Sequence, residues 1–406
     1  MKILLVSLNY APEQTGIGKF QGEMAVWLAA RGHQVRVVAA PPYYPEWKIG
    51  QGHSAWRYKI EETKGVRIYR IPLYVSSVQT GVNRLIHLLS FAVTSFPVIV
   101  WQALWRPDAV MLTAPPLMAA PAVLLAGLLS GAQTHLHVQD FEVDAAFNLG
   151  LLNKGWLFGP ATRVERAFLH AFSTVSSISP RMRDRLLAKG VPENRALLIP
   201  NWADINAFNP AQGAGAWLER LKKDPETILV LYSGNLGKKQ GLEVIVDAAR
   251  KLRGDPHIRF VVSGDGAGRE KMVADAAGLE NVIFLPVQPE REFVHMMIAA
   301  DIHLLPQRAE AADLVMPSKL GNMLASGKPI VAGAKPNTQV YEAVQGCGIA
   351  VTPDNADEFV RAILVLAEDK ELRAQMGEVG LRRARESWAR DGILSKLETE
   401  LGRGRH

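Results

Sequence analysis

The chain has 406 residues, 48% of them hydrophobic and 21% charged, which is typical of a folded globular protein too long for a single core. Its formal net charge of +6 favours phosphate-bearing ligands or an anionic membrane surface. The sequence has no basic stripe with interleaved aromatic residues, which argues against binding to nucleic acid. The single cysteine, Cys347, excludes an internal disulfide and a cysteine-rich metal site. The first apolar run, KILLVSL, is too short for a signal peptide, so we expect a cytoplasmic protein.

Apolar strand patterns alternate with helical patterns along the whole chain. This alternation is typical of parallel sheets covered by helices, and it predicts an α/β fold with two doubly wound, Rossmann-like domains. We expect a first domain over residues 1–200 and a second over 201–385, with the Gly-, Pro- and Asn-rich stretch 201–226 as a linker. The expected strands lie near residues 2–8, 34–40, 65–72, 108–115, 134–140, 173–179, 227–234, 257–264, 281–287, 301–307, 329–334 and 348–353.

Residues 85–105, LIHLLSFAVTSFPVIVWQALW, interrupt this alternation with 21 residues that carry no formal charge. By length the stretch could span a bilayer, but His87, Gln102 and the central Pro97 argue against a true span. Two interpretations stay open: a buried or surface-apolar helix, and a helix that lies in the membrane interface.

The first candidate anion site follows the first strand. In NYAPEQTGIGKF, Gly16 and Gly18 stand directly before a helix expected over 18–31, where small residues let backbone N–H groups approach a phosphate. The dinucleotide fingerprint requires its glycines immediately after the strand. Because this loop does not fit that pattern, a nicotinamide-dependent dehydrogenase is disfavoured.

Three further loops follow strands of the second half. The sequence SGNLGKKQGLE carries Asn235, Lys238 and Lys239 before a helix, which suits a diphosphate but also fits a solvated turn. In SGDGAGRE, Gly264, Gly266 and Gly268 serve either tight turning or close approach of a ligand, and we assign Gly264 and Asp265 to the ligand site. In PSKLGNMLASGKP we assign Ser318, Lys319 and Asn322 to the ligand; the alternative is that Ser318 only caps the helix and Asn322 faces solvent.

These motifs together resemble the retaining GT-B glycosyltransferases of family 4. The resemblance rests on G-H-x-V at 32–35, SISPRMRDRLLAKGVPENRALLIPNWADINAF at 177–208, YSGNLGKKQG, SGDG, NVIFLPV and ASGKPIVA. The segments HVQDFEVDAAFNLGLL, NLGKKQGLE and VMPSKLGNMLASGKP look closer to colanic-acid-type exopolysaccharide enzymes, which include fucosyltransferases.

The resemblance implies two Rossmann-like domains that face across a cleft, with a GDP- or UDP-sugar held by the second and an acceptor by the first. It implies no metal or other cofactor. It implies phosphate-binding lysines at Lys238 or Lys239 and at Lys319, a base near Val287, and a helix near 386–406 that packs back on the first domain. In place of an arginine that many members carry, this chain has Asn235.

The family also carries two glutamates separated by seven residues. Alignment on the ASGKP exit puts Leu314 and Asn322 at these positions, so both carboxylates are absent. Asn322 can still hydrogen-bond a ribose hydroxyl, and Glu310 or Asp313 can supply an acid to the sugar.

Retaining transfer builds negative charge on the departing diphosphate, so Lys238 and Lys319 are the predicted catalytic cations. Asp140, which ends a strand, is the candidate that orients or deprotonates the acceptor hydroxyl, with Glu142 and Asp144 as alternatives; it could also simply cap the strand. The acceptor expected for a surface polysaccharide is a glycan on a polyprenyl diphosphate at the cytoplasmic membrane surface.

Two other functions remain open from the sequence. A nucleotide-sugar epimerase would use the same diphosphate site, and it would release an epimerised sugar nucleotide without any acceptor. A non-catalytic assembly partner would bind a nucleotide sugar without turnover, and the absent glutamates give that interpretation some support.

Overall fold

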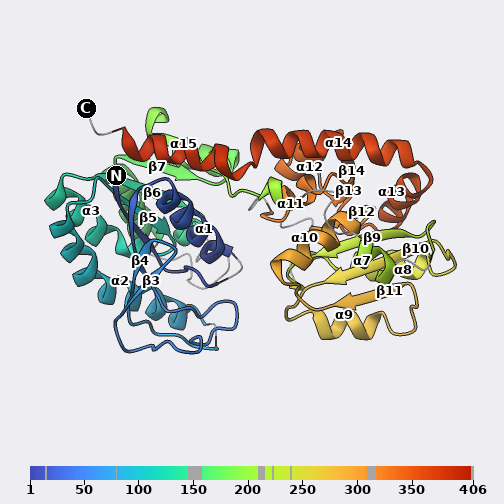
Figure 1. Cartoon of the computed structure of the whole chain (residues 1–406), viewed down its shortest axis with the longest axis horizontal. Helices are drawn as coiled ribbons and strands as arrows, with labels where there is room; N and C mark the ends of the chain where they lie inside the picture. The colour runs from blue at the N-terminus through green and yellow to red at the C-terminus, as the bar shows by residue number, and fades with distance from the viewer. Residues whose placement is uncertain are drawn as a thin grey trace. The chain divides into compact units, whose positions relative to one another are not determined.

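The computed structural model describes residues 1–13, 16–78, 80–144, 158–208, 215–221, 224–237, 240–308 and 317–403. The chain forms two compact units: Met1–Asn201 together with Asp391–His406, and Trp202–Arg390. Each unit is a sheet covered by helices on both faces (Figure 1). The predicted α/β class with two Rossmann-like units is therefore confirmed.

The first sheet has the strand order β3-β4-β2-β1-β5-β6-β7-β8. All neighbouring strands pair in parallel except β3 and β4. Its central strands are buried on both faces, which explains their near-continuous apolar sequences. The strands are β1 Lys2–Ser7, β2 Gln34–Ala39, β3 Lys59–Thr63, β4 Val66–Arg70, β5 Ala109–Ala114, β6 Gln133–Val138, β7 Thr174–Ser177 and β8 Ala196–Leu198.

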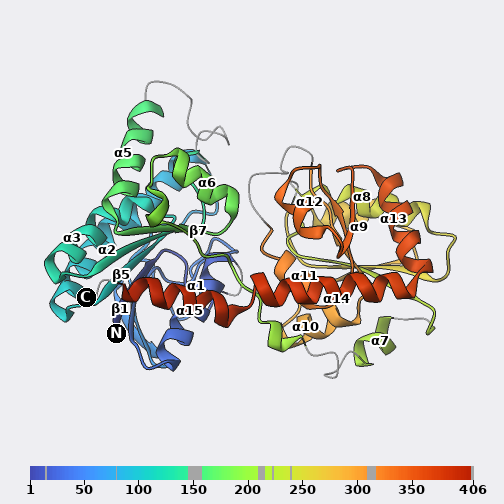
Figure 2. The same ribbon diagram turned by 90° about the horizontal axis from the view of Figure 1, so that it is seen from above.

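Helices cover both faces of this sheet (Figure 2). One face carries α1 (Gly16–Ala30) and α15 (Arg390–Gly402); the other carries α2 (Gly81–Gln102), α3 (Ala120–Ser130), α5 (Phe158–Ala171) and α6 (Pro180–Ala188). The hydroxyl of Thr80 accepts from Asn83 N and caps α2, and Ser179 caps α6 in the same way. Short 3-10 turns, η1 Ala103–Trp105, η2 Leu117–Ala119 and η3 Glu193–Arg195, follow α2, β5 and α6.

The last helix belongs to the first unit. The Trp27 indole donates to Asp391 at 2.8 Å, and His33 lies 2.6 Å from Glu398. Apolar side chains of α15, including the fully buried Leu394, face the sheet. Burial of this helix face ties the end of the chain to α1 and the sheet edge.

The second sheet is fully parallel, with the order β11-β10-β9-β12-β13-β14. One face is covered by α8, α9 and α13, the other by α7, α10, α11, α12 and α14. The strands are β9 Ile228–Ser233, β10 Ile258–Ser263, β11 Val282–Leu285, β12 Ile302–Leu305, β13 Ile330–Gly333 and β14 Gly348–Val351. The helices are α7 Gly215–Leu221, α8 Glu243–Lys251, α9 Arg269–Asp275, α10 Glu290–Ala299, α11 Leu320–Ala325, α12 Gln339–Val344, α13 Ala356–Glu368 and α14 Lys370–Ser387.

The stretch predicted as a hinge or linker, 201–226, contains the boundary between the units at Asn201 and Trp202, but its other described residues belong to the second unit, so a linker of that length was wrong. Phe208, after the 3-10 turn η4 (Ile205–Ala207), and Trp217 are buried in the core on the α10 and α11 side. The Trp217 indole also donates to Glu292 at 2.8 Å. The abundance of Gly, Pro and Asn concealed these aromatic anchors.

Candidate active site

The strand order of the second sheet reverses between β9 and β12. In open parallel sheets, ligands bind outside the carboxyl ends of the strands at such a reversal. The loops that begin at Gly234, Gly264, Pro286 and Pro306 leave the sheet at this edge. All four loops contain residues that the sequence assigned to a nucleotide sugar.

The glycine loops after β9 and β10 pack backbone to backbone. A Cβ on Gly264 would lie 1.9 Å from the Gly234 carbonyl oxygen, and the φ of Gly264 is +149°. The loops exchange hydrogen bonds, from Leu236 N to Asp265 O at 2.8 Å and from Gly268 N to Leu236 O at 2.7 Å. Packing between loops thus accounts for Gly264, independently of any ligand.

Asn235 and Asp265 point from these joined loops toward solvent. Both side chains are exposed, and the Asp265 carboxylate accepts from Gly266 N at 2.8 Å. A Cβ on Gly266 would lie 2.5 Å from Asn235 Oδ1, so the Asn235 side chain lies over the second loop. Both residues are accessible at the carboxyl edge of the sheet.

Lys319 lies at the same edge, against the end of β9. Its Nζ is 4.1 Å from the centroid of the Tyr232 ring, a cation–π geometry, and a Cβ on Gly234 would be 3.6 Å from it. Among the described residues no carboxylate pairs with this half-buried lysine. Burial lowers its pKa to about 7, because removing the ammonium from water disfavours its charged form.

Tyr232 is a site residue that the sequence analysis missed. Its ring is fully buried, and its hydroxyl donates to the Asn235 carbonyl at 2.8 Å, which leaves the ring face to Lys319. The available signal was an aromatic residue one position before the end of a strand, where the strand leads into a glycine loop.

Ser318 and Asn322 flank Lys319 on α11. The helix has no side-chain N-cap, so the alternative in which Ser318 only caps the helix is wrong; its side chain is exposed. Asn322 is half-buried, and its amide makes no hydrogen bond to another described residue. It is therefore open to a hydroxyl ligand. Gly321 packs α11 against Trp388, which would be 3.0 Å from an added Cβ.

Four predicted residues, Lys238, Lys239, Glu310 and Asp313, lie outside the described residues, as does Leu314. Their assignments stay predictions. Val287 lies two residues after the end of β11 and is 61% exposed, so an apolar surface is available at the position predicted for the base.

In the first unit, the loop after β1 is organised by Glu13. Its buried carboxylate accepts from Tyr43 N at 3.1 Å, Tyr44 N at 3.0 Å and Asn9 Nδ2 at 3.0 Å. Burial raises its pKa. A Cβ on Gly18 would lie 2.5 Å from Glu13 Oε2.

The two predicted glycines of this loop therefore have different roles. Gly18 makes room for Glu13, whereas Gly16 has a φ of +60° that favours glycine. The sequence analysis missed Glu13; an acid shortly before two glycines at a helix start was its only signal.

Three carboxylates gather after β6. Asp140 lies two residues after the strand end and keeps surface accessible to solvent; the protein around its carboxylate displaces water, which raises the pKa, and the charge of Arg84 lowers it. Glu142 accepts from Leu117 N at 2.6 Å, and burial raises its pKa to about 7. Asp144 is paired with Lys189 at 3.2 Å and Arg185 at 3.4 Å.

These contacts separate the three alternatives for the acceptor base. Asp144 is already committed to two cations, and a paired carboxylate is a poor base. Asp140 and Glu142 keep carboxylates with raised pKa values at the carboxyl edge of the sheet, and a raised pKa makes a carboxylate a better proton acceptor.

His135 and His137 form a buried polar ladder between β6 and β7. His135 lies 2.7 Å from Thr174 Oγ1, and both histidines lie 2.8 Å from Ser176 Oγ. Burial lowers their pKa values to about 3 and about 4. No group of three or more potential metal ligands occurs among the residues that the structure describes.

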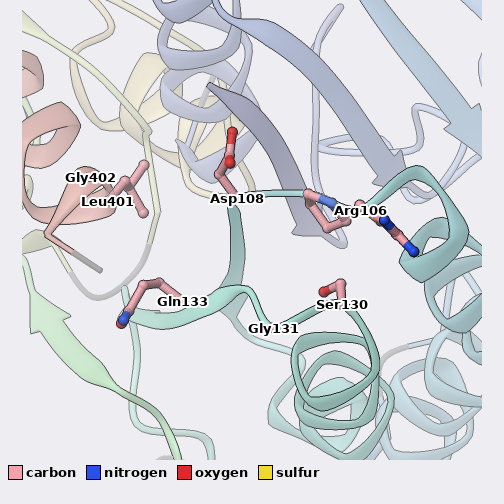
Figure 3. A pocket seen from close by; sticks show the side chains of 8 residues that line it. Arg106, Asp108, Ser130, Gly131, Gln133, Leu401 and Gly402 are labelled. Carbon is pink, nitrogen blue, oxygen red and sulfur yellow. The ribbon is translucent and has the colours of Figure 1, made fainter. Parts of the chain in front are cut away.

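A cavity of about 220 Å³ lies at the opposite edge of the first sheet (Figure 3). It is lined by Asp108 and Gln133, near the amino ends of β5 and β6, and by Gly402 at the end of α15. Because parallel sheets bind ligands at their carboxyl ends, this cavity is not the candidate site.

Two family models match the chain. A glycosyl transferase 4-like domain matches residues 15–202, and a domain of glycosyl transferases group 1 matches residues 215–383. The second match contains the interlocked loops and Lys319, and the first contains the Glu13-neighbouring glycines and Asp140.

Individual proteins agree with these matches. A protein of Escherichia coli strain K12, named the colanic acid biosynthesis glycosyl transferase WcaI, is 43% identical over 89% of this chain and 91% of its own length. A GDP-mannose-dependent phosphatidylinositol monomannoside mannosyltransferase of Mycobacterium tuberculosis is 24% identical over 98% of this chain and 97% of its own.

Solved structures share the fold. The structure of Anabaena HepE in complex with UDP aligns with a TM-score of 0.70 at 17% identity, over 99% of both chains. The predicted transferase class is confirmed by the family models and by these names. The chain belongs to the glycosyltransferases of the family 4 type, with the GT-B fold.

Proposed function

We propose that the enzyme transfers a sugar, with retention, from a GDP- or UDP-sugar to a polyprenyl-diphosphate-linked glycan in bacterial exopolysaccharide synthesis. It works in the cytoplasm at the inner face of the membrane and without a metal ion. The second unit holds the donor, and the first holds the acceptor.

The observation that carries this proposal is the environment of Lys319. Its ammonium lies on the Tyr232 ring beside Gly234, at the reversal of the strand order, with no anionic partner among the described residues. A diphosphate supplies the missing negative charge. The exposed Val287 and the free Asn322 amide are available to the base and to a sugar or ribose hydroxyl.

In the reaction, the bond from the anomeric carbon to the diphosphate oxygen breaks while the acceptor oxygen bonds to the same face of that carbon. Lys319, together with Lys238, stabilises the charge that builds on the diphosphate. Asp140 or Glu142 orients the acceptor hydroxyl and takes its proton.

The names of related proteins support the substrate classes. The 43% identical relative is named for colanic acid, an exopolysaccharide, and a more distant one for GDP-mannose and a lipid acceptor. HepE, which shares the fold, was solved with UDP. Transfer of a sugar is common to the first two names, and a lipid-bound acceptor is named only for the second.

Calorimetry with a panel of sugar nucleotides, GDP-fucose included, tests the proposal. We expect one donor to bind the wild type and Lys319→Ala to weaken it about 10- to 100-fold, since a hydrogen bond to a charged group contributes about 1.5–3 kcal/mol. The exposed Lys370 on α14 gives the matched control, Lys370→Ala, which should bind like the wild type.

Absence of binding for every donor would refute the proposal and favour the non-catalytic interpretation. Equal binding by wild type and Lys319→Ala would place the diphosphate elsewhere. Release of an epimerised nucleotide sugar in the absence of acceptor would instead support the epimerase alternative.

A further inference from the structure

One segment of the first unit is unusually rich in tyrosine and tryptophan. Residues 41–58, PPYYPEWKIGQGHSAWRY, connect β2 to β3 and contain five of these residues among 18, whereas aromatic residues make up 7% of the chain. The exposed apolar side chains of this segment are Tyr44, Pro45, Trp56 and Tyr58. Since Tyr and Trp combine an apolar ring face with a polar edge, they favour a ligand that has both kinds of surface.

Both ends of the segment lie at the carboxyl edge of the first sheet. It starts two residues after the end of β2. Strand β3 is antiparallel to β4, and Lys59 at its start pairs with Arg70 at the end of β4. Asp140, after β6, lies at the same edge. Strands β2 and β6 are three positions apart, about 14 Å at the usual strand spacing, a distance that an oligosaccharide can span.

The backbone of the first half of the segment is fixed by hydrogen bonds. The buried carboxylate of Glu13 accepts from Tyr43 N at 3.1 Å and from Tyr44 N at 3.0 Å. Gly50 N donates to the Pro42 carbonyl at 2.7 Å. The two tyrosines are therefore tied to the loop after β1, which carries the candidate glycines.

The Trp47 ring is also held in place. Its centroid lies 5.4 Å from that of the Tyr43 ring and 5.3 Å from that of the His87 ring. His87 in turn lies 2.6 Å from the Tyr74 carbonyl. Trp47 has a φ of +52°, and a residue other than glycine keeps this unfavourable left-handed backbone only where its surroundings enforce it.

Tyr44 presents its ring to solvent beside Trp47. The two centroids are 6.4 Å apart, the ring planes are inclined by 81°, and Tyr44 is 37% exposed. Its hydroxyl makes no hydrogen bond to another described residue. A Cβ on Gly16 would lie 3.8 Å from Tyr44 Cε1, so the ring lies beside the start of α1. Between the two aromatic residues in the sequence, the Glu46 side chain is exposed.

Trp56 differs from Tyr44, although it is 81% exposed. Its indole makes no ring contact or hydrogen bond with another described residue. A side chain without a fixed position loses more conformational freedom when it binds a ligand. The fixed pair, rather than Trp56, therefore provides a prepared binding surface.

The chemistry of this pair suits a sugar ring. A pyranose has apolar faces of C–H bonds and a rim of hydroxyls, so it can lie flat on an aromatic ring while carboxylates and phenols bind its hydroxyls. An aliphatic partner has no use for the polar groups. Within residues 41–58, all of them described, the exposed apolar side chains include no aliphatic one apart from proline.

We infer that Tyr44 and Trp47 form a binding subsite for a pyranose of the acceptor glycan, which stacks on the Tyr44 ring and offers its hydroxyls to Glu46. The inference rests on the proposed function, because the glycan is the acceptor of that reaction. It makes Tyr44 a residue that selects the acceptor by its sugar.

Saturation-transfer NMR on the full-length protein tests the inference. The probes are the methyl pyranosides of glucose, galactose, mannose and fucose, each without donor. We expect at least one to receive saturation from the protein, strongest at the C–H protons of one ring face, as stacking requires. This pattern is read on the wild type and does not depend on any variant.

Variants assign the signal to the subsite. Tyr44→Ala should lower it at least fivefold, whereas Tyr44→Phe, which keeps the ring, should retain most of it. Trp56→Ala removes a more exposed aromatic residue of the same segment and is the matched control; it should behave like the wild type. Thermal unfolding checks that each variant folds.

Three results would overturn the inference: no saturation of any of the four glycosides, wild-type binding by Tyr44→Ala, or an equal loss in Trp56→Ala. Loss of partition onto phosphatidylcholine vesicles in Tyr44→Ala, with sugar binding unchanged, would mean that the ring contacts lipid instead. Calorimetry separates these failures from failure of the proposed function, since Tyr44→Ala should bind the donor like the wild type.

Discussion

Replacement of Gly264 by alanine tests the conclusion that the two glycine loops of the donor site hold each other in place. The added Cβ would lie 1.9 Å from the Gly234 carbonyl oxygen, far inside van der Waals contact, so the loops must separate. Separation breaks the bonds of Leu236 N to Asp265 O and Gly268 N to Leu236 O. Two backbone hydrogen bonds at about 1 kcal/mol each and about 1–3 kcal/mol of backbone strain at positive φ together predict a loss of about 3–5 kcal/mol.

Two further glycines separate the contributions. Gly278 has a φ of +80° but open space around its added Cβ, and Gly254 has open space and no left-handed backbone. Thermal unfolding should rank the alanine variants Gly254, Gly278 and Gly264 in order of increasing damage. At roughly 2–4 °C per kcal/mol for a domain of this size, Gly264→Ala should lower Tm by about 10 °C and weaken donor binding. A Gly264→Ala variant that unfolds with Gly254→Ala and binds donor normally would refute the loop-packing argument.

Three other outcomes follow from the same structure. Because the pKa of Lys319 is about 7, its ammonium is present below pH 7 and lost above it. Donor affinity measured by calorimetry should therefore fall as pH rises from 7 to 9, up to about tenfold per pH unit. Lys319→Arg should show no such fall, and a parallel fall in that variant would contradict the assignment. Glu142 has a pKa of about 7 in the folded protein, against an ordinary value of 4.5, so its ionisation disfavours the fold as pH rises from 4.5 to 7. In urea unfolding, the free energy of unfolding of Glu142→Gln should gain about 1–3 kcal/mol relative to wild type between pH 5 and 8. A difference between the two proteins that does not change with pH would argue against this pKa. Leu394 is fully buried under α15, so Leu394→Ala should cost about 2–5 kcal/mol and speed limited proteolysis within α15; unchanged cleavage would mean that the helix is held by its polar contacts alone.

The sequence predicted the strands well because buried parallel strands are nearly continuous apolar runs. Two strands were missed for physical reasons. β3, KIEET, is an edge strand with mostly exposed side chains, so it has no apolar pattern to detect, and β8 has only three residues. Edge strands with charged side chains avoid aggregation, and the same property hides them from a search for hydrophobic residues.

The sequence indicated where on the sheet the candidate site lies, but it did not indicate the contacts that shape the site. A glycine after a strand indicates a close approach, yet the approaching group at Gly264 is the Gly234 carbonyl, which lies 30 residues earlier. The depressed pKa of Lys319 depends on the Tyr232 ring and on the absence of a nearby acid among the described residues. Both are long-range facts of packing that no local pattern encodes.

Helix α2 shows a further limit of sequence patterns. Its composition fits a bilayer span, a core helix or an interface helix equally well. The structure adds one fact that composition lacks: His87 and Gln102 lie on the buried face of the helix. Polar residues on the buried face carry this information, and a simple count of apolar residues treats them only as interruptions.

The discontinuous first unit has a consequence for biosynthesis. The chain leaves this unit at Asn201 and returns to it at Asp391, so a ribosome makes the whole second unit before it makes α15. Until then the surface that Leu394 covers is open to water and to other nascent chains. The first unit, although it is translated first, is the last to be completed, and its apolar surface under α15 is exposed to aggregation during that interval.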